Sequence, residues 1–157
     1  MSAFVLPLVE RAAANFLRAQ TFVMTDEDRI NFDSTRIYEG LFREWTVGEE
    51  GQVLVPCVTC SCVNAISEAL YAGNWQAELL VAVRSKVFDT SDTKHLVMVE
   101  EVMAYLFSST IADDLTNALA GFTAELVVPR QQSRTVENNC WVSVARFQVN
   151  CCGSTIS

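Results

Sequence analysis

The sequence predicts an α+β fold in which helices pack on one face of a largely antiparallel, four-stranded sheet. Three observations lead to this prediction. Some segments repeat apolar residues at helical spacing, others alternate apolar and polar residues, and the strand-like segments follow one another in pairs. The chain has 157 residues and no internal repeat or Pro/Gly-rich linker, which indicates a single domain spanning 1–157.

The first expected element is a helix from Leu6 to Phe22, with Pro7 in its first turn. The segment Thr25–Gly51 follows and holds eight carboxylates and three arginines, so it is expected to be an acidic loop or insertion. Within it, Ile37–Trp45 has apolar residues at helical spacing. A short helix and an extended loop are both compatible with that stretch.

Two strands are expected next, joined as a long hairpin. Gln52–Ala65 is apolar at both odd and even positions, which is typical of a strand covered on both faces. Pro56 has no backbone N–H, so it is expected near the start of this strand or at a sheet edge. Trp75–Phe88 alternates cleanly, with apolar residues on one face and polar residues on the other.

The remaining elements are two helices and two strands. The helices are expected at Lys94–Phe107 and Ile111–Ala120. The strands are expected at Phe122–Pro129 and Cys140–Cys151, separated by a polar loop over Gln131–Asn138. The expected core includes Phe16, Val55, Leu79, Val81, Val99, Met103, Leu106, Leu126, Phe147 and Val149.

Composition excludes several classes of function. The net charge of −8 argues against a nucleic-acid grip made by neutralising phosphates. The single histidine, His95, lies in the first turn of an expected helix, where a capped and solvated side chain is favoured over a catalytic base. No apolar run approaches the ~20 residues of a membrane span, so no membrane partner is expected. No catalytic or phosphate-binding motif occurs, and the chain is predicted not to be an enzyme.

Five of the six cysteines lie in two clusters, Cys57-x-x-Cys60-x-Cys62 and Cys151-Cys152. On a regular strand Cys60 and Cys62 face one side and Cys57 the other, so three thiolates do not converge on one metal ion. The first residues lack the basic leader of a signal peptide, which favours reduced thiols in a cytosol. No metal or cofactor is therefore expected, and a cysteine-based metal or redox protein is kept as an alternative.

Several local strings resemble the tail-terminator and tail-completion (neck) proteins of long-tailed bacteriophages. The resemblance covers about Ala12 to Gly153 but not the acidic segment. It rests on Leu54-Val55-Pro56-Cys57-Val58, Gly73-Asn74-Trp75-Gln76-Ala77-Glu78, Val83-Arg84-Ser85 with Asp89 to His95, Asp113-Asp114-Leu115 before Gly121-Phe122-Thr123, and Trp141-Val142-Ser143 running to Cys151-Cys152.

The resemblance implies a structural virion protein, assembled in the host cytoplasm, that forms a hexameric ring at the head-proximal end of the tail. Its partners would be further copies of the chain, the tail tube protein and the head-completion or connector protein. DNA would pass through the channel without sequence-specific binding. A small cytosolic binding or adaptor module is the other alternative. The candidate interface residues are Asp26, Glu27, Asp28, Trp45, Gln76, Glu78, Arg84, Lys86, Gln131 and Gln132.

Overall fold

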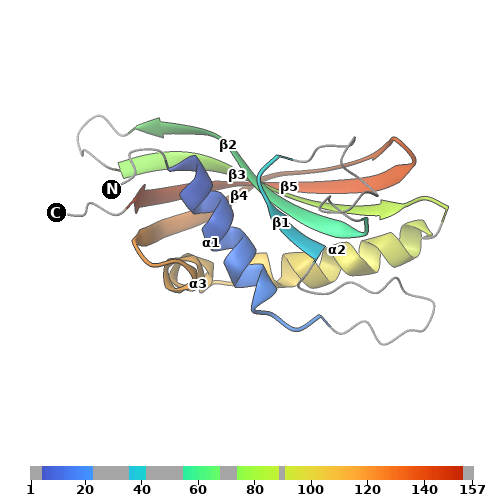
Figure 1. Ribbon diagram of the computed structural model, residues 1–157, viewed down its shortest axis with the longest axis horizontal. Helices are drawn as coiled ribbons and strands as arrows, with labels where there is room; N and C mark the ends of the chain where they lie inside the picture. The colour runs from blue at the N-terminus through green and yellow to red at the C-terminus, as the bar shows by residue number, and fades with distance from the viewer. Residues whose placement is uncertain (1–4, 23–35, 42–54, 68–73, 89–90, 154–157) are drawn as a thin grey trace.

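The computed structural model describes residues 5–22, 36–41, 55–67, 74–88 and 91–153 (Figure 1). These residues form three helices and five strands. In chain order they are α1 (Leu6–Arg18), β1 (Ile37–Glu39), β2 (Cys57–Ser67), β3 (Asn74–Lys86), α2 (Asp92–Leu106), α3 (Ile111–Ala118), β4 (Phe122–Glu137) and β5 (Cys140–Gly153).

The strands form one sheet in the order β1-β2-β3-β5-β4. Neighbouring strands run antiparallel except β1, which pairs parallel to β2 with Ile37 opposite Val58. The α+β class and the β2–β3 hairpin are thus confirmed, while the sheet has five strands instead of four. The added strand corrects the short helix considered over Ile37–Trp45. Residues 37–39 hydrogen-bond to β2 instead, and Gly40, at φ 102°, ends the strand.

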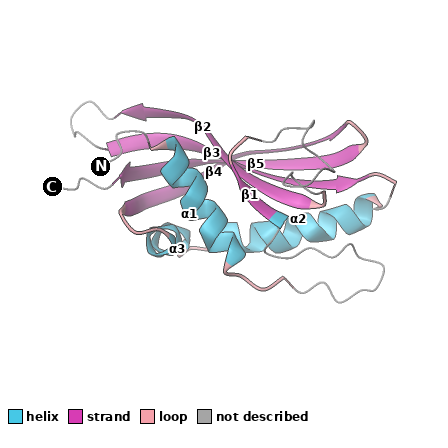
Figure 2. Cartoon of the chain, viewed as in Figure 1, coloured by secondary structure: helices cyan, strands magenta, loops and turns pink. Residues whose placement is uncertain are grey.

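All three helices pack on the same face of the sheet, which we call the helix face (Figure 2). The sheet residues of the main buried cluster alternate along each strand, as in Leu79, Val81 and Val83 of β3 and Ala145, Phe147 and Val149 of β5. The opposite face, which we call the open face, carries the intervening residues. None of the described helices lies on the open face.

Helix α1 sits closely on the sheet because its inward side is small. Ala12, Ala13 and Ala14 are fully buried, with Phe16 and Leu17 filling the space on the same side. Pro7 lies in the first turn, as predicted, although the helix ends at Arg18 and not at Phe22. Burying a side chain of the size of Phe16 or Leu17 stabilises the fold by roughly 1.5–3 kcal/mol, so this contact is a major source of stability.

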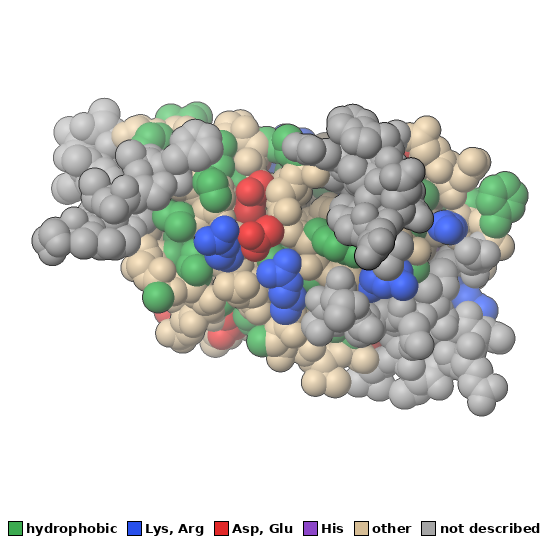
Figure 3. Space-filling model, in the orientation of Figure 1, with side chains coloured by type: hydrophobic (Ala, Val, Ile, Leu, Met, Phe, Trp, Pro, Cys, Tyr) green, Lys and Arg blue, Asp and Glu red, His purple; other side chains and the backbone are tan. Residues whose placement is uncertain are grey.

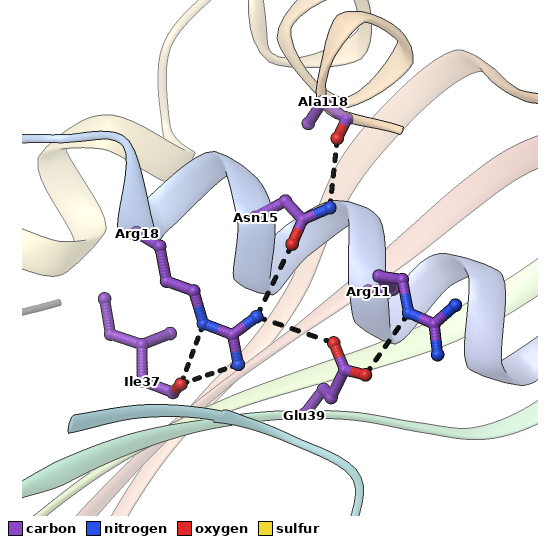
Figure 4. A network of polar contacts seen from close by, with 6 residues as sticks. All are labelled: Arg11, Asn15, Arg18, Ile37, Glu39 and Ala118. Atoms are coloured by element: carbon purple, nitrogen blue, oxygen red, sulfur yellow. Dashed lines mark hydrogen bonds and ion pairs between the residues drawn. The ribbon is translucent and has the colours of Figure 1, made fainter. Parts of the chain in front are cut away.

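A polar network ties α1 to β1 and to the end of α3 (Figure 4). The guanidinium of Arg18 donates to the carbonyl of Ile37 at 3.0 and 2.8 Å and lies 3.6 Å from the Glu39 carboxylate, which also pairs with Arg11 at 3.3 Å. Asn15 donates to the carbonyl of Ala118 at 3.1 Å. Figure 3 shows acidic side chains beside basic ones on this side of the molecule. These ion pairs are partly exposed, so they add little energy and mainly fix orientation.

Glu10 protects the edge of β2 where the short strand β1 stops. Its carboxylate accepts the Cys62 backbone N–H at 2.9 Å, and Gly40 N–H donates to the Cys60 carbonyl at 2.9 Å. Burial raises the pKa of Glu10, the hydrogen bond from Cys62 lowers it, and the charge of Glu39 raises it. A side chain thus satisfies a backbone donor that none of the described strands reaches.

Strand β2 begins at Cys57, directly after Pro56, as the missing proline N–H predicts. All six residues from Cys57 to Cys62 are buried. This agrees with the expectation that both faces of the strand are covered there. From Val63 onward the strand is exposed or half-buried, so the covering is confined to its first half.

The polar loop predicted over Gln131–Asn138 is wrong, because β4 continues to Glu137 and pairs with β5 throughout. The turn between these strands consists of Asn138 and Asn139, both with positive φ (51° and 62°). Two left-handed residues give the tight hairpin turn whose twist matches that of the strands. The backbone therefore stays in register although the side chains are polar.

A bulge in β4 corrects one predicted core residue. The register shifts between Ala124 and Leu126, which puts Leu126 on the open face at 50% exposure. Val127 packs against the core in its place. Of the other nine predicted core residues, seven are buried, namely Phe16, Leu79, Val81, Met103, Leu106, Phe147 and Val149, and two, Val55 and Val99, are half-buried.

Candidate functional site

The open face gathers four of the predicted interface residues on one strand. Gln76, Glu78, Arg84 and Lys86 all project from β3 on the side opposite the core residues Leu79 and Val81. The alternation read from the sequence is therefore confirmed in β3. The neighbouring positions on β2 and β5 share this side because the strands pair in register.

Glu78 is the centre of a cross-strand network on the open face. It accepts a hydrogen bond from the Asn64 amide of β2 at 2.8 Å and forms an ion pair with Arg146 of β5. The side chains of Arg146 and Glu78 are 44% and 22% exposed, so water screens the pair only in part. These contacts link β2, β3 and β5 across the open face.

Three further side-chain contacts lie on the open face. Arg84 donates to the Thr59 hydroxyl of β2 at 2.9 Å. On the side of β4, Arg130 donates to the side-chain oxygen of Gln148 at 3.2 Å, and Gln148 donates to Asn150 at 3.0 Å. All these side chains are polar, which is typical of a surface that contacts water or a polar partner.

Apolar side chains interrupt the polar surface at one end of the open face. Ile66 is 68% exposed, and Leu126 lies on the same face at the far edge strand. A shallow hollow of about 240 Å³ lies beside Ile66, and its lining includes Asn64, Ile66, Gln76, Glu78, Arg130 and Arg146. Exposed apolar residues beside a polar network are common at protein–protein interfaces.

The other predicted interface residues do not all join this surface. Gln131 projects from the open face, but Gln132 projects from the helix face, because neighbouring strand residues point to opposite sides. The prediction treated them as one loop and is wrong on this point. Asp26, Glu27, Asp28 and Trp45 lie outside the described residues.

A buried polar cluster around His95 was missed by the sequence analysis. His95 is 2% exposed, which corrects the expectation of a solvated side chain. Its Nδ1 lies 2.7 Å from the Ser85 hydroxyl of β3, and its Nε2 lies 2.9 Å from the Ser143 hydroxyl of β5. Burial lowers the pKa of His95, and the charge of Asp92 opposes this shift.

The His95 cluster joins α2 to two strands. Ser85 is fully buried and Ser143 is 6% exposed, and a hollow of about 270 Å³ beside the cluster is lined in part by His95 and Ser143. A signal was present in the sequence. His95 stands three and seven residues before the buried Met98 and Val102, and both serines occupy core-facing positions of their strands.

Four of the six cysteines are buried, and Cys140 and Cys152 are half-buried. Cys60, Cys62 and Cys151 belong to the main buried cluster, whereas Cys57 lies on the open side of β2, as the strand alternation predicts. Burial raises the pKa of Cys57, Cys60, Cys62 and Cys151 to about 12. These four thiols are therefore protonated at neutral pH, and the thiolate is the form that attacks or binds metal.

Comparison with known proteins adds no family assignment. A scan against models of protein families and a search of curated proteins found no match to the chain. Among the residues that the structure describes, no helix has the length and apolar character needed to cross a membrane. Inference about function therefore depends on the geometry of the open face and on the sequence resemblance.

Proposed function

We propose that this chain is a structural subunit of the neck of a tailed bacteriophage that forms a ring, as its resemblance to tail terminators implies. The observation that carries the proposal is that the described helices cover only one face of the sheet. Although the first half of β2 is buried on both faces, the part of the open face around Glu78 presents a cross-strand polar network flanked by the exposed Ile66 and Leu126. A further copy of the chain is the simplest partner for such a face.

In this proposal six copies form the ring, which contacts the tail tube protein on one side and the head-completion or connector protein on the other. DNA passes through the central channel. The net charge of −8 suits that passage, because like charges keep the phosphate backbone from adhering. The protein would reside in the virion after assembly in the host cytoplasm.

The cysteine-based alternative receives less support from the structure. Thiols with a pKa near 12 make weak nucleophiles and weak metal ligands at neutral pH, and burial is the main cause for each of the four. Their apolar surroundings indicate a packing role.

Light scattering coupled to size exclusion tests the ring, and electron microscopy of the same fraction tests its symmetry. We expect a species of about six chain masses with a central channel. Labelled antibody against the chain should mark the junction of head and tail in phage particles. A strictly monomeric protein, both in solution and in its own particle, would contradict the proposal.

A further inference from the structure

The two sides of the molecule carry opposite charge. On the open face of β3, β4 and β5 four basic residues stand against two acidic ones, which leaves an excess of two positive charges. The basic residues are Arg84, Lys86, Arg130 and Arg146, and the acidic ones are Glu78 and Glu137, while Glu125 in the β4 bulge has no pairing partner that assigns it to either face. This excess is notable in a chain whose net charge is −8.

The helix side shows the reverse. Helices α1, α2 and α3 together carry six acidic residues and three basic residues, an excess of three negative charges. The acidic residues are Glu10, Asp92, Glu100, Glu101, Asp113 and Asp114, and the basic ones are Arg11, Arg18 and Lys94. Asp92, Glu100 and Asp113 are exposed, so their charges reach the surface.

The helix side also has an apolar groove. Leu96, Val99 and Met103 of α2 form one wall, Gln132 and Arg134 of β4 form part of the other, and the groove volume is about 440 Å³. Glu100 lies at the same groove. Four consecutive apolar residues, Leu96 to Val99, spread around α2, so the helix cannot turn all of them toward its own sheet.

We infer that the basic open face of one copy docks onto the acidic helix side of the next copy. The inference rests on the proposed ring and names the two surfaces that would build it. Charge complementarity sets the orientation of the contact, and the apolar groove together with Ile66 and Leu126 supplies surface that favours burial.

The position of the two surfaces determines the type of assembly. They lie on opposite sides of the sheet, so each copy uses one to receive a neighbour and the other to reach the next. Such a contact is head-to-tail. Head-to-tail contacts close into a ring when the rotation from one copy to the next is a whole fraction of a full turn. A two-fold dimer would instead bring the same surface of both copies together. Each of these surfaces carries an excess of one sign of charge, so it would repel its own copy.

Charge reversal on each surface tests the docking. One variant combines Lys86→Glu with Arg130→Glu, and the other combines Glu100→Lys with Asp113→Lys. All four residues are exposed, so the fold should survive, which circular dichroism and thermal unfolding will check. Each variant alone should raise the concentration needed for half-assembly by at least about tenfold. Equimolar mixing of the two variants should restore assembly, because opposite charges then meet at every contact.

Arg11→Glu is the control. It makes the same change from base to acid at an exposed position of α1, outside the open face and the groove beside α2. It should leave assembly intact. Wild-type assembly should weaken between about 0.05 M and about 0.5 M salt, because screening shortens the reach of surface charges.

The outcomes separate this inference from the proposed function. If the wild-type protein assembles but the reversals leave it unchanged, or if mixing fails to restore assembly, the docking inference is overturned and the ring proposal stands. If the wild-type protein is monomeric in solution and in its particle, both are overturned.

Discussion

Two regions of the same sheet differ in how far their side chains are buried. The first is the region where α1 packs on β2 and β3, and the second is the end of the β4–β5 hairpin. In the first region the strand residues facing α1, such as Cys60, Leu79 and Val81, are buried in a single cluster. In the second, every residue from Pro129 to Asn139 is exposed. Both regions nevertheless keep continuous strand pairing, apart from the bulges.

The comparison shows that burial and strand pairing are separate causes of β structure. In the covered region the apolar side chains drive the sheet against the helix. In the hairpin end, strand pairing continues because its register is fixed at both ends. The core-facing part of β5 fixes one end, and the Asn138–Asn139 turn fixes the other. Because β4 is the last of the described strands in the sheet order, no described strand pairs with the outer side of its backbone.

The largest expected effect lies in the covered region. Leu79 is 1% exposed at the centre of the core, so Leu79→Ala should lower the free energy of unfolding by about 2–5 kcal/mol. Urea titration followed by circular dichroism measures this loss. A loss below about 0.5 kcal/mol would mean that Leu79 is not buried and that the helices pack on the other face of β3.

The turn of the exposed hairpin gives the next effect. Asn139 has φ 62°, a conformation that disfavours β-branched residues, so Asn139→Val should cost about 1–2 kcal/mol. Asn139→Gly adopts the same conformation without strain and should be neutral or stabilising. Equal stability for both variants, measured by thermal unfolding, would contradict a tight two-residue turn.

The sequence predicts the covered region better than the exposed hairpin. Alternation along Trp75–Phe88 identified the buried and open faces of β3, because one face of that strand is in apolar contact and the other is not. Residues 131–137 carry no apolar alternation, so periodicity could not identify them as a strand. The only local signal was the Asn-Asn pair before Trp141.

The missed features depend on contacts that are distant in sequence. The strand Ile37–Glu39 exists because β2 offers it a free edge, and the helical spacing of its neighbours gave no hint of that edge. His95 is buried because serines 10 and 48 residues away satisfy both ring nitrogens. Gln76, Glu78, Arg84 and Lys86 lie on one face because all four share one parity on a single strand.

The His95 cluster predicts a pH dependence. The pKa of His95 is lowered in the folded protein, so the unfolded chain binds its proton more readily. His95 therefore destabilises the fold as the pH falls below about 6.5, by at most about 1.4 kcal/mol for each pH unit, and has no effect above that range. Glu10, whose pKa is raised, has an opposite slope at lower pH, so the wild type must be compared with His95→Gln at each pH.

The wild-type protein should lose stability relative to His95→Gln between about pH 7 and pH 5. Chemical unfolding at several pH values measures the difference. If the wild type instead gained stability relative to His95→Gln on acidification, the folded state would favour the charged imidazole. The fold would then raise the pKa of His95 instead of lowering it.

The smallest effect tests the bulge at the boundary between the two regions. Regular alternation from Phe122 would bury Leu126 and expose Val127, but the bulge reverses the two. Leu126→Ala should therefore change the free energy of unfolding of the monomer by less than about 0.5 kcal/mol. Val127→Ala removes fewer atoms but should cost more, about 1 kcal/mol, because Val127 packs against the core. Denaturant unfolding of both variants at a concentration where the chain is monomeric decides the order. If Leu126→Ala proved the costlier change, the strand would run without the bulge, and Leu126 would leave the open face on which its part in docking depends.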